Sequence, residues 1–178
     1  DNVNDKEKKT ITRENIKLGI IGAGNFSRRV LIPNLASCGV DLYGIAASSG
    51  ISPVEIGKKY GFKIATTDVL ELINNSEINT VVIATRHNSH GELVKLALRA
   101  KKNVFVEKPL CLNSKELNDI RDSYTKDKLL MVGFNRRFAP LIAKLKNQLK
   151  KLSGVKSFIY TVNSGKLPLD HWTKDPEV

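Results

Sequence analysis

Two glycines stand two residues apart after a short apolar run, residues 17–21, in a position where they could bind a phosphate. Gly22 can form a tight turn, and Gly24 has no side chain to keep the backbone away from an anion. A helix starting here would offer unpaired N–H groups and the positive end of its dipole, and Ser27, small enough for close packing, replaces the third glycine of the fingerprint. Two glycines can simply mark a turn, but between a strand and a helix they favour a dinucleotide site. The expected contacts are Gly22, Gly24, Asn25 and Phe26.

The position that would contact the adenosine ribose follows the second predicted strand, residues 41–47. An acidic residue there would bind the 2′-hydroxyl of NAD, but the chain has Ser48 and Ser49 instead. Both serines can donate to a 2′-phosphate, and Lys58 or Lys59 can add charge, although no arginine is adjacent. The segment therefore slightly favours NADP and leaves NAD open, and the serines could also just begin a turn.

Three further polar segments follow apolar, strand-like runs. They are residues 85–90, residues 107–109 and residues 135–138. Each alone could be a solvated loop. Ligands of open α/β sheets bind beyond the carboxyl ends of the strands, so we expect these segments to line one crevice with the glycine loop.

The elements that would position these segments alternate between strand and helix. Apolar runs such as residues 80–84 show no polar alternation, which indicates strands buried on both faces of a parallel sheet. The expected fold is α/β, a doubly wound Rossmann sheet over residues 16–135, preceded by a disordered lead-in, residues 1–15. The predicted strands are 17–21, 41–47, 63–65, 80–84, 103–106 and 129–134, and the predicted helices are 26–36, 52–60, 67–73, 89–100 and 113–124. The first of these helices is expected to have Phe26, Val30, Leu31 and Leu35 on one face. Ser52, Thr67, Ser89 and Asn113 are the expected residues at the starts of the others, with Ser89 and Glu92 forming a capping box.

Residues 136–178 are expected to begin an α+β substrate domain that is incomplete in this chain. Residues 139–152 predict a basic amphipathic helix, for which an apolar stripe facing a core is favoured over a membrane-surface role. Residues 155–163 alternate in the manner of a long antiparallel strand. Since one strand cannot bury itself, a second copy of the chain is a candidate partner, which predicts a homo-oligomer.

The composition argues against other classes of protein. The net charge is +11, but the basic residues are not interleaved with stacking aromatic residues and no nucleic-acid motif is present. We therefore expect no nucleic-acid partner. No apolar run is long enough to span a membrane, and the polar N-terminal residues do not resemble a secretory signal, so a cytoplasmic location is expected.

The motifs ATRHNSH, VFVEKPLCL, GFNRRFAP and GAGNF resemble the glucose-fructose oxidoreductase, inositol dehydrogenase and rhizopine-catabolism family of NAD(P)-dependent enzymes. The similarity runs from about Ile16 to Phe138, and the EKP motif is its most specific element. Arg86 stands where many members carry proline, as in a subgroup fused behind a zinc-type alcohol-dehydrogenase-like region. No zinc-ligand pattern occurs in these residues, so no metal is assigned.

The resemblance implies hydride transfer between a carbon of a sugar or cyclic polyol and C4 of nicotinamide. It implies that Lys108 orients the reacting hydroxyl and assists proton transfer, and that His90 and Asn88 lie near the nicotinamide-side ribose. His90 is the second catalytic candidate, although it could simply belong to the first turn of its helix. The remaining expected cofactor contacts are Thr85, Arg86, Glu107, Lys108, Asn135 and Arg136.

Several alternatives stay open at this point. Glu107 and Lys108 could form an exposed pair, and Arg136 could serve an interdomain salt bridge. The family's usual catalytic histidine lies further downstream, and His171 does not match its motif, so this chain alone is expected to bind dinucleotide with little or no turnover. A non-catalytic dinucleotide sensor is the alternative function, because the glycine loop would serve both.

Overall fold

A computed structural model describes residues 15–47, 53–163 and 165–166. It divides the chain into two compact units, residues 1–132 and residues 133–178, which are described separately below. Residues 1–14 of the predicted lead-in 1–15, the ribose-site serines Ser48 and Ser49, the predicted helix cap Ser52 and His171 lie outside the described residues.

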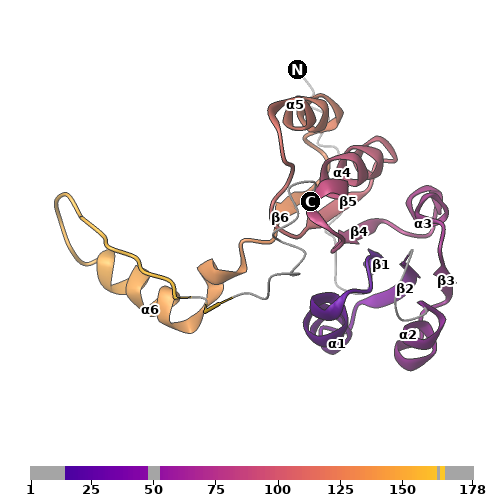
Figure 1. Ribbon diagram of the computed structural model, residues 1–178, viewed down its shortest axis with the longest axis horizontal. Coiled ribbons are helices and arrows are strands. Elements are labelled where there is room, and N and C mark those ends of the chain that lie inside the picture. The colour runs from indigo at the N-terminus through magenta and orange to yellow at the C-terminus, as the bar shows by residue number, and fades with distance from the viewer. Residues whose placement is uncertain (1–14, 48–52, 164, 167–178) are drawn as a thin grey trace, which may run out of the picture. The chain divides into compact units, whose positions relative to one another are not determined.

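Six parallel strands form the sheet of the first unit (Figure 1). Their order is β3-β2-β1-β4-β5-β6, which is the order of a doubly wound dinucleotide-binding sheet. The predicted α/β Rossmann class is therefore confirmed, and each predicted strand of this unit is present with its ends shifted by no more than two residues. The strands are β1 Lys17–Ile21, β2 Asp41–Ala46, β3 Ile64–Thr66, β4 Thr80–Ile83, β5 Asn103–Val106 and β6 Leu130–Val132.

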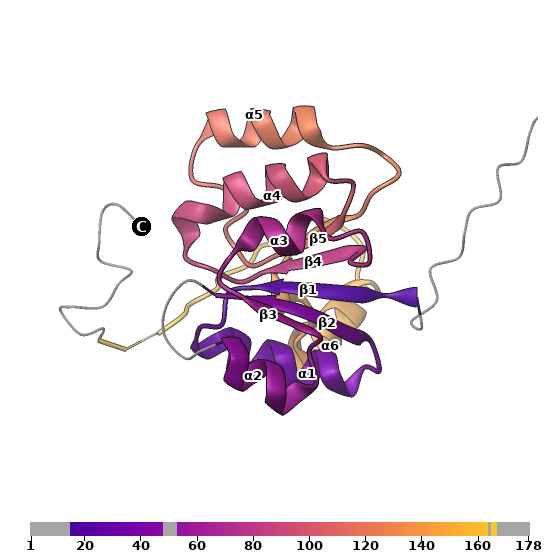
Figure 2. The same cartoon turned by 90° about the vertical axis from the view of Figure 1, so that its right-hand side faces the viewer.

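Helices cover both faces of this sheet (Figure 2). α1 (Ile32–Ser37) and α2 (Pro53–Tyr60) lie on one face, α3 (Val69–Asn74) and α4 (His90–Arg99) lie on the other, and α5 (Ser114–Ser123) packs outside α4. The sequence of β4 does not alternate between apolar and polar residues, because both faces of this strand are buried. Val82 packs in the cluster that includes Ile32, whereas Val81 and Ile83 pack in the opposite cluster with Leu72.

The helix after β1 departs from its prediction because of Pro33. A π-helical turn, Ser27–Leu31, precedes α1, and the Ile32 N–H donates to Ser27 O five residues back. Proline has no N–H and its ring collides with the carbonyl four residues earlier, so a regular α-helical ladder could not run through Pro33. The extra residue in the turn also rotates the helix surface. As a result, Phe26 is 44% and Val30 41% exposed, so these two residues of the predicted apolar face do not pack, whereas Leu31 and Leu35 pack against the core as predicted.

Two of the predicted helix starts are wrong in their capping residue. Asp68, not Thr67, caps α3, since its side chain accepts an N–H of the first turn at 2.8 Å. Ser89 makes no capping bond, because a 3-10 turn precedes α4 and the Ser89 hydroxyl donates to the carbonyl of Arg86 at 2.9 Å. The predicted capping box of Ser89 with Glu92 is therefore not formed.

Asn113 caps α5 as the sequence predicts. Its Oδ1 accepts the N–H of Glu116 at 2.9 Å, and Glu116 Oε2 accepts the N–H of Leu112 at the same distance. We expect Asn113→Ala to cost about 1 kcal/mol, which is a fall of roughly 2–4 °C in Tm. Thermal unfolding checks this, with Ser114→Ala as the neighbouring control that removes a hydroxyl and no capping bond. Equal Tm values for the two variants would contradict the assignment.

The second unit contains a 3-10 turn, Asn135–Phe138, and α6, Pro140–Leu149, which confirms the predicted basic helix. The predicted strand at 155–163 is wrong, since none of these residues lies in a strand. A strand needs a hydrogen-bonded neighbour, and the described part of this unit pairs none with it. Val155 and Ile159 are fully exposed. The strand through which two copies were expected to pair is therefore absent from the described residues, and the homo-oligomer stays a prediction.

None of the described helices has both the length and the apolar character needed to cross a membrane.

Candidate functional site

The loops that carry the candidate residues leave the same edge of the first unit. The Gly22 N–H donates to Ala46 O at 2.9 Å, and the Ala84 N–H donates to the last residue of β1 at 2.8 Å. The Glu107 N–H donates to the last residue of β4 at 2.9 Å. These bonds extend the parallel ladder by one residue beyond each strand. The glycine loop therefore lies between the ends of β2 and β4, and the Glu107 loop lies beside β4.

Gly22 is the tightest point of this edge. Its φ is +106°, and a Cβ at this position would lie 2.4 Å from the carbonyl oxygen of Ala84 and 2.6 Å from its carbon. Only glycine adopts this conformation without strain. The residue lets the chain turn away from β1 directly against the backbone that leaves β4.

Gly24 differs from Gly22, because a Cβ there would meet no heavy atom within 4 Å. Residues 25 and 26 are already helical, so the first N–H groups of the helix lie beside an open loop. Asn25 Oδ1 accepts from the guanidinium of Arg28 at 3.1 Å, which holds a cation at this helix end. Sequence reasoning missed Arg28, for which its place in the first helical turn was the only signal. Exposed amides and a nearby cation suit an anion.

Ser27 is 1% exposed at the third position of the glycine fingerprint. Its Oγ has no hydrogen-bond partner among the residues that the structure describes. The small side chain allows the helix to pack closely on the sheet, as the sequence predicts. Together, the tight Gly22, the open Gly24 and the small Ser27 match the pattern of a dinucleotide-binding loop.

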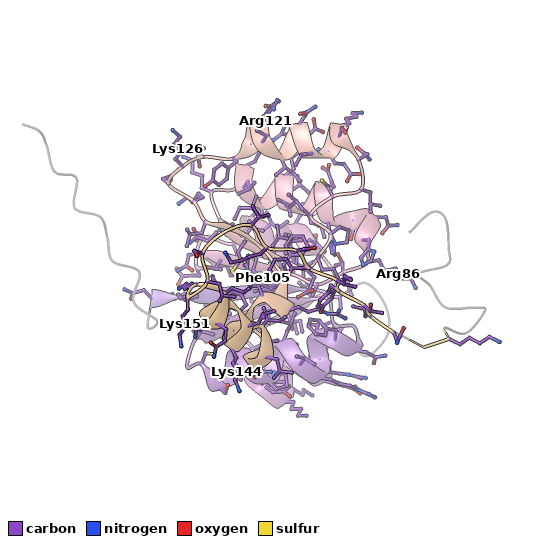
Figure 3. The ribbon with its side chains drawn as sticks, turned by 90° about the vertical axis from the view of Figure 1, so that its left-hand side faces the viewer. Arg86, Phe105, Arg121, Lys126, Lys144 and Lys151 are labelled. Atoms are coloured by element: carbon purple, nitrogen blue, oxygen red, sulfur yellow. The ribbon has the colours of Figure 1, made fainter. Side chains whose placement is uncertain are left out.

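The loop after β4 forms the next wall of the edge. Thr85 Oγ1 and Ser89 Oγ lie 2.6 Å apart, and the Ser89 hydroxyl also donates to Arg86 O, which fixes the 3-10 turn His87–Ser89. Arg86 and Asn88 are exposed, and Thr85 is half-buried. Figure 3 places Arg86 at the carboxyl edge of the first unit, with Lys126 at the opposite end.

His90 is completely buried and joins two of these loops. Its Nδ1 lies 2.6 Å from Pro109 O, and its Nε2 lies 3.2 Å from Thr85 O. A side chain with no exposed surface cannot touch a bound substrate in this arrangement. Its hydrogen bonds instead tie the loop that carries Lys108 to the loop after β4.

Lys108 and His87 lie on these two loops. Lys108 is exposed, Glu107 is half-buried, and the His87 ring stands edge-on to that of His90, with 5.8 Å between centroids. Burial lowers the pKa of His87, and its electrostatic interactions with His90 and Lys108 act in the same direction. Sequence reasoning did not single it out, although its place between Arg86 and Asn88 was visible.

Two predicted site residues belong to the other unit. Asn135 and Arg136 lie in the 3-10 turn Asn135–Phe138, where both are exposed. They remain predictions as cofactor contacts. Within the described ranges of the chain, no three His, Cys, Asp or Glu side chains come together in a way that could hold a metal ion.

The fold and the glycine-lined edge define a dinucleotide-binding domain of the Rossmann type. Residues 16–134 match the family described as "Oxidoreductase family, NAD-binding Rossmann fold". The chain belongs to this family, which is the one that its motifs resemble.

The comparisons with individual proteins agree with this assignment. Myo-inositol 2-dehydrogenase of Thermotoga maritima is 35% identical over 135 residues, which are 74% of this chain and 40% of that enzyme. Levoglucosan dehydrogenase of Pseudarthrobacter phenanthrenivorans is 28% identical across 92% of this chain and 43% of its own length. A crystal structure of a probable dehydrogenase from Thermotoga maritima superposes with a TM-score of 0.68 at 32% identity, covering 76% of this chain and 41% of that one. The chain thus spans about two fifths of these relatives.

Proposed function

We propose that the first unit binds NAD(H) or NADP(H) at the carboxyl edge of its sheet. The open backbone at Gly24 carries this proposal, because the first N–H groups of the helix and the Arg28 guanidinium are both close to it. The diphosphate would lie on residues 22–26. Ser48 and Ser49 are the proposed contacts of the adenosine ribose, and their hydroxyls slightly favour the 2′-phosphate of NADP over NAD.

The nicotinamide half of the cofactor would extend toward the loops after β4 and β5. Thr85, Arg86, Asn88 and Glu107 are its proposed contacts there. When bound, the nicotinamide ring supplies the carbon that exchanges a hydride with the substrate. Lys108 would hold the reacting hydroxyl through its ammonium group. His90 would act by position, since its ring fixes Pro109 next to Lys108.

The proposed substrate is an alcohol of the sugar or cyclic-polyol class. The names of the two curated relatives, a myo-inositol dehydrogenase and a levoglucosan dehydrogenase, support this class. Residues 136–178 would begin the domain that binds this substrate. We therefore propose that this chain alone binds dinucleotide but turns over little substrate, and that the full-length protein is the oxidoreductase.

Titration of the purified chain with NADH and NADPH, followed by nucleotide fluorescence, tests the site and the choice of cofactor together. Gly24→Val is expected to weaken binding at least tenfold, about 1.4 kcal/mol, with little change in Tm, because a Cβ at this position meets no heavy atom within 4 Å and the added side chain would enter the proposed volume of the diphosphate. Ala36→Val, on the exposed far end of the same helix, is the matched control.

Two results would overturn the proposal. One is an absence of binding of either reduced nucleotide to the folded wild-type chain. The other is equal affinity of Gly24→Val and Ala36→Val for the reduced nucleotide. A side chain at Gly24 that does not weaken binding would mean that the nucleotide does not lie on this loop.

A further inference from the structure

Both ring nitrogens of the buried His90 face backbone carbonyl oxygens. Nδ1 lies 2.6 Å from Pro109 O in the loop after β5, and Nε2 lies 3.2 Å from Thr85 O in the loop after β4. A carbonyl oxygen can only accept a hydrogen bond, so each contact needs an N–H on the ring. A neutral imidazole has one N–H, whereas an imidazolium has two. The two bonds can therefore exist together only when the ring is charged.

The lengths of the two contacts agree with this reading. A neutral N–H···O bond is usually about 2.9–3.0 Å long, and a charged donor shortens it. The 2.6 Å between Nδ1 and Pro109 O is shorter than that neutral value. A neutral ring would keep its hydrogen on Nδ1 for this bond. Its bare Nε2 would then turn a lone pair toward Thr85 O, and the longer contact of 3.2 Å would be lost.

A carboxylate lies next to the turn that carries the ring. His90 is the first residue of α4, where the positive end of the helix dipole disfavours a cation. The Glu116 side chain of α5 packs against the next residue, since a Cβ at Gly91 would lie 2.6 Å from Glu116 Oε2. Hydrogen bonds from the Leu112 N–H and the Asn113 amide hold this carboxylate in place. Glycine at position 91 thus admits a negative charge that offsets the dipole.

Other titratable groups lie on the elements around the ring. They are Arg86 and His87 before α4, Glu92 and Lys95 of α4, and Glu107, Lys108 and Cys111 of the loop after β5. Glu92 pairs with Lys95, and burial together with the charge of Glu116 raises the pKa of the Cys111 thiol, which stays uncharged at neutral pH. The cation of Lys108 opposes a charge on His90, whereas Glu116 favours it.

We propose that His90 positions Lys108 as a buried imidazolium that donates one N–H to each of the two loops. This inference rests on the proposed function, in which Lys108 holds the substrate oxygen. With its proton, the ring fixes the Lys108 loop relative to the loop after β4. Without it, the Thr85 contact opens and the two loops are no longer tied. An imidazole ordinarily changes charge between about pH 5 and 8, so the tie is closed on the acid side and opens as pH rises.

The first test needs neither nucleotide nor turnover. NMR of this chain with ¹⁵N-labelled histidine shows how many ring nitrogens of His90 carry hydrogen. The chain has three histidines, so the His87→Asn and His171→Asn variants assign His90 by elimination, without a change at His90 itself. At about pH 6 we expect two N–H signals from this ring, both protected from exchange by burial. One N–H and one bare nitrogen at that pH would overturn the proposal.

The second test removes the negative charge beside the ring. Glu116→Gln should move the loss of the second N–H signal to a lower pH, because a carboxylate that favours the imidazolium is gone. Asp122→Asn removes the same charge at the other, exposed end of α5 and should leave the transition in place. Equal transitions in the two variants would contradict a charged His90, because a neutral ring that merely ties two loops does not respond to Glu116.

The third test follows the consequence for turnover, in the full-length protein with NAD⁺ or NADP⁺ and myo-inositol or levoglucosan. The kcat for oxidation should fall as pH rises through the loss of the His90 proton. His90→Gln should lower kcat roughly 10- to 100-fold and remove this alkaline limb, while NADH and NADPH bind as before. An unchanged alkaline limb in His90→Gln would assign the positioning of Lys108 to another group. Failure of the dinucleotide site itself would appear in the Gly24→Val titrations and would leave both NMR results as they are.

Discussion

Replacing Gly22 with alanine is expected to destabilise the first unit by about 2–5 kcal/mol and to lower its Tm by roughly 10 °C. Two costs add at this position. The φ of +106° strains any residue with a Cβ, and that Cβ would lie 2.4 Å from the carbonyl oxygen of Ala84. The colliding atoms belong to the backbone at the end of β4, so a side-chain rotation cannot relieve the contact.

Gly24→Ala is the matched comparison, because the added methyl there has open space and the backbone conformation suits any residue. It should leave the free energy of unfolding within about 0.5 kcal/mol of the wild-type value. Thermal or urea unfolding of both variants gives the difference directly. A Gly22→Ala protein as stable as Gly24→Ala would mean that β1 and β4 do not approach as closely as the structure shows.

These two glycines therefore have different roles that the sequence pattern could not separate. Gly22 is required by the protein's own backbone. At Gly24 no other atom of the protein needs the space, so the absence of a side chain there matters only for binding a ligand. A loss of binding in Gly24→Val reports on the ligand, but a loss of binding in Gly22→Ala reports first on the fold.

The strands were predictable because the physical signal for them is local. The runs at 17–21 and 103–106 match their predicted bounds, since a strand buried on both faces is continuously apolar and is ended by polar residues or glycine. The convergence of the loops was predictable for a related reason. Once the strands are parallel, their carboxyl ends share one edge, whatever the side chains do.

The errors arose where a backbone bond or a tertiary contact overrides the local pattern. Pro33 forces a π-helical turn that shifts the helix face. The Ser89 hydroxyl donates to the carbonyl of Arg86 in the preceding turn and does not cap the helix. The alternation at 155–163 has no neighbour to pair with in the described unit. The spacing of apolar residues predicts none of these outcomes.

The two histidines of one loop show the same limit within the site. His90 and His87 both follow β4, and the family motif pointed to His90. A single 3-10 turn places the His90 ring in the core, between two backbone carbonyls, and leaves His87 at the edge with Lys108. Spacing alone gives no sign of which ring turns inward.

Lys108→Met is expected to lower turnover of the full-length protein by about 10²- to 10⁴-fold while dinucleotide binding is retained. The exposed ammonium group is proposed to hold the substrate oxygen as hydride leaves the carbon, and methionine keeps the length of the side chain without its charge. Because Lys108 is exposed, the variant's free energy of unfolding should stay within about 0.5 kcal/mol of the wild-type value. Steady-state kinetics and nucleotide titration on the same preparation separate the two effects.

Lys108→Arg makes the assignment sharper, because it keeps the charge but replaces a compact ammonium by a planar, forked group. We expect it to remain well below wild-type turnover, since the position of the cation relative to the substrate oxygen matters as well as its charge. Full activity in Lys108→Met, with bound cofactor, would remove the central residue of the enzyme proposal. The dinucleotide site would then be better explained as a sensor, which requires the glycine loop but no cation at Lys108.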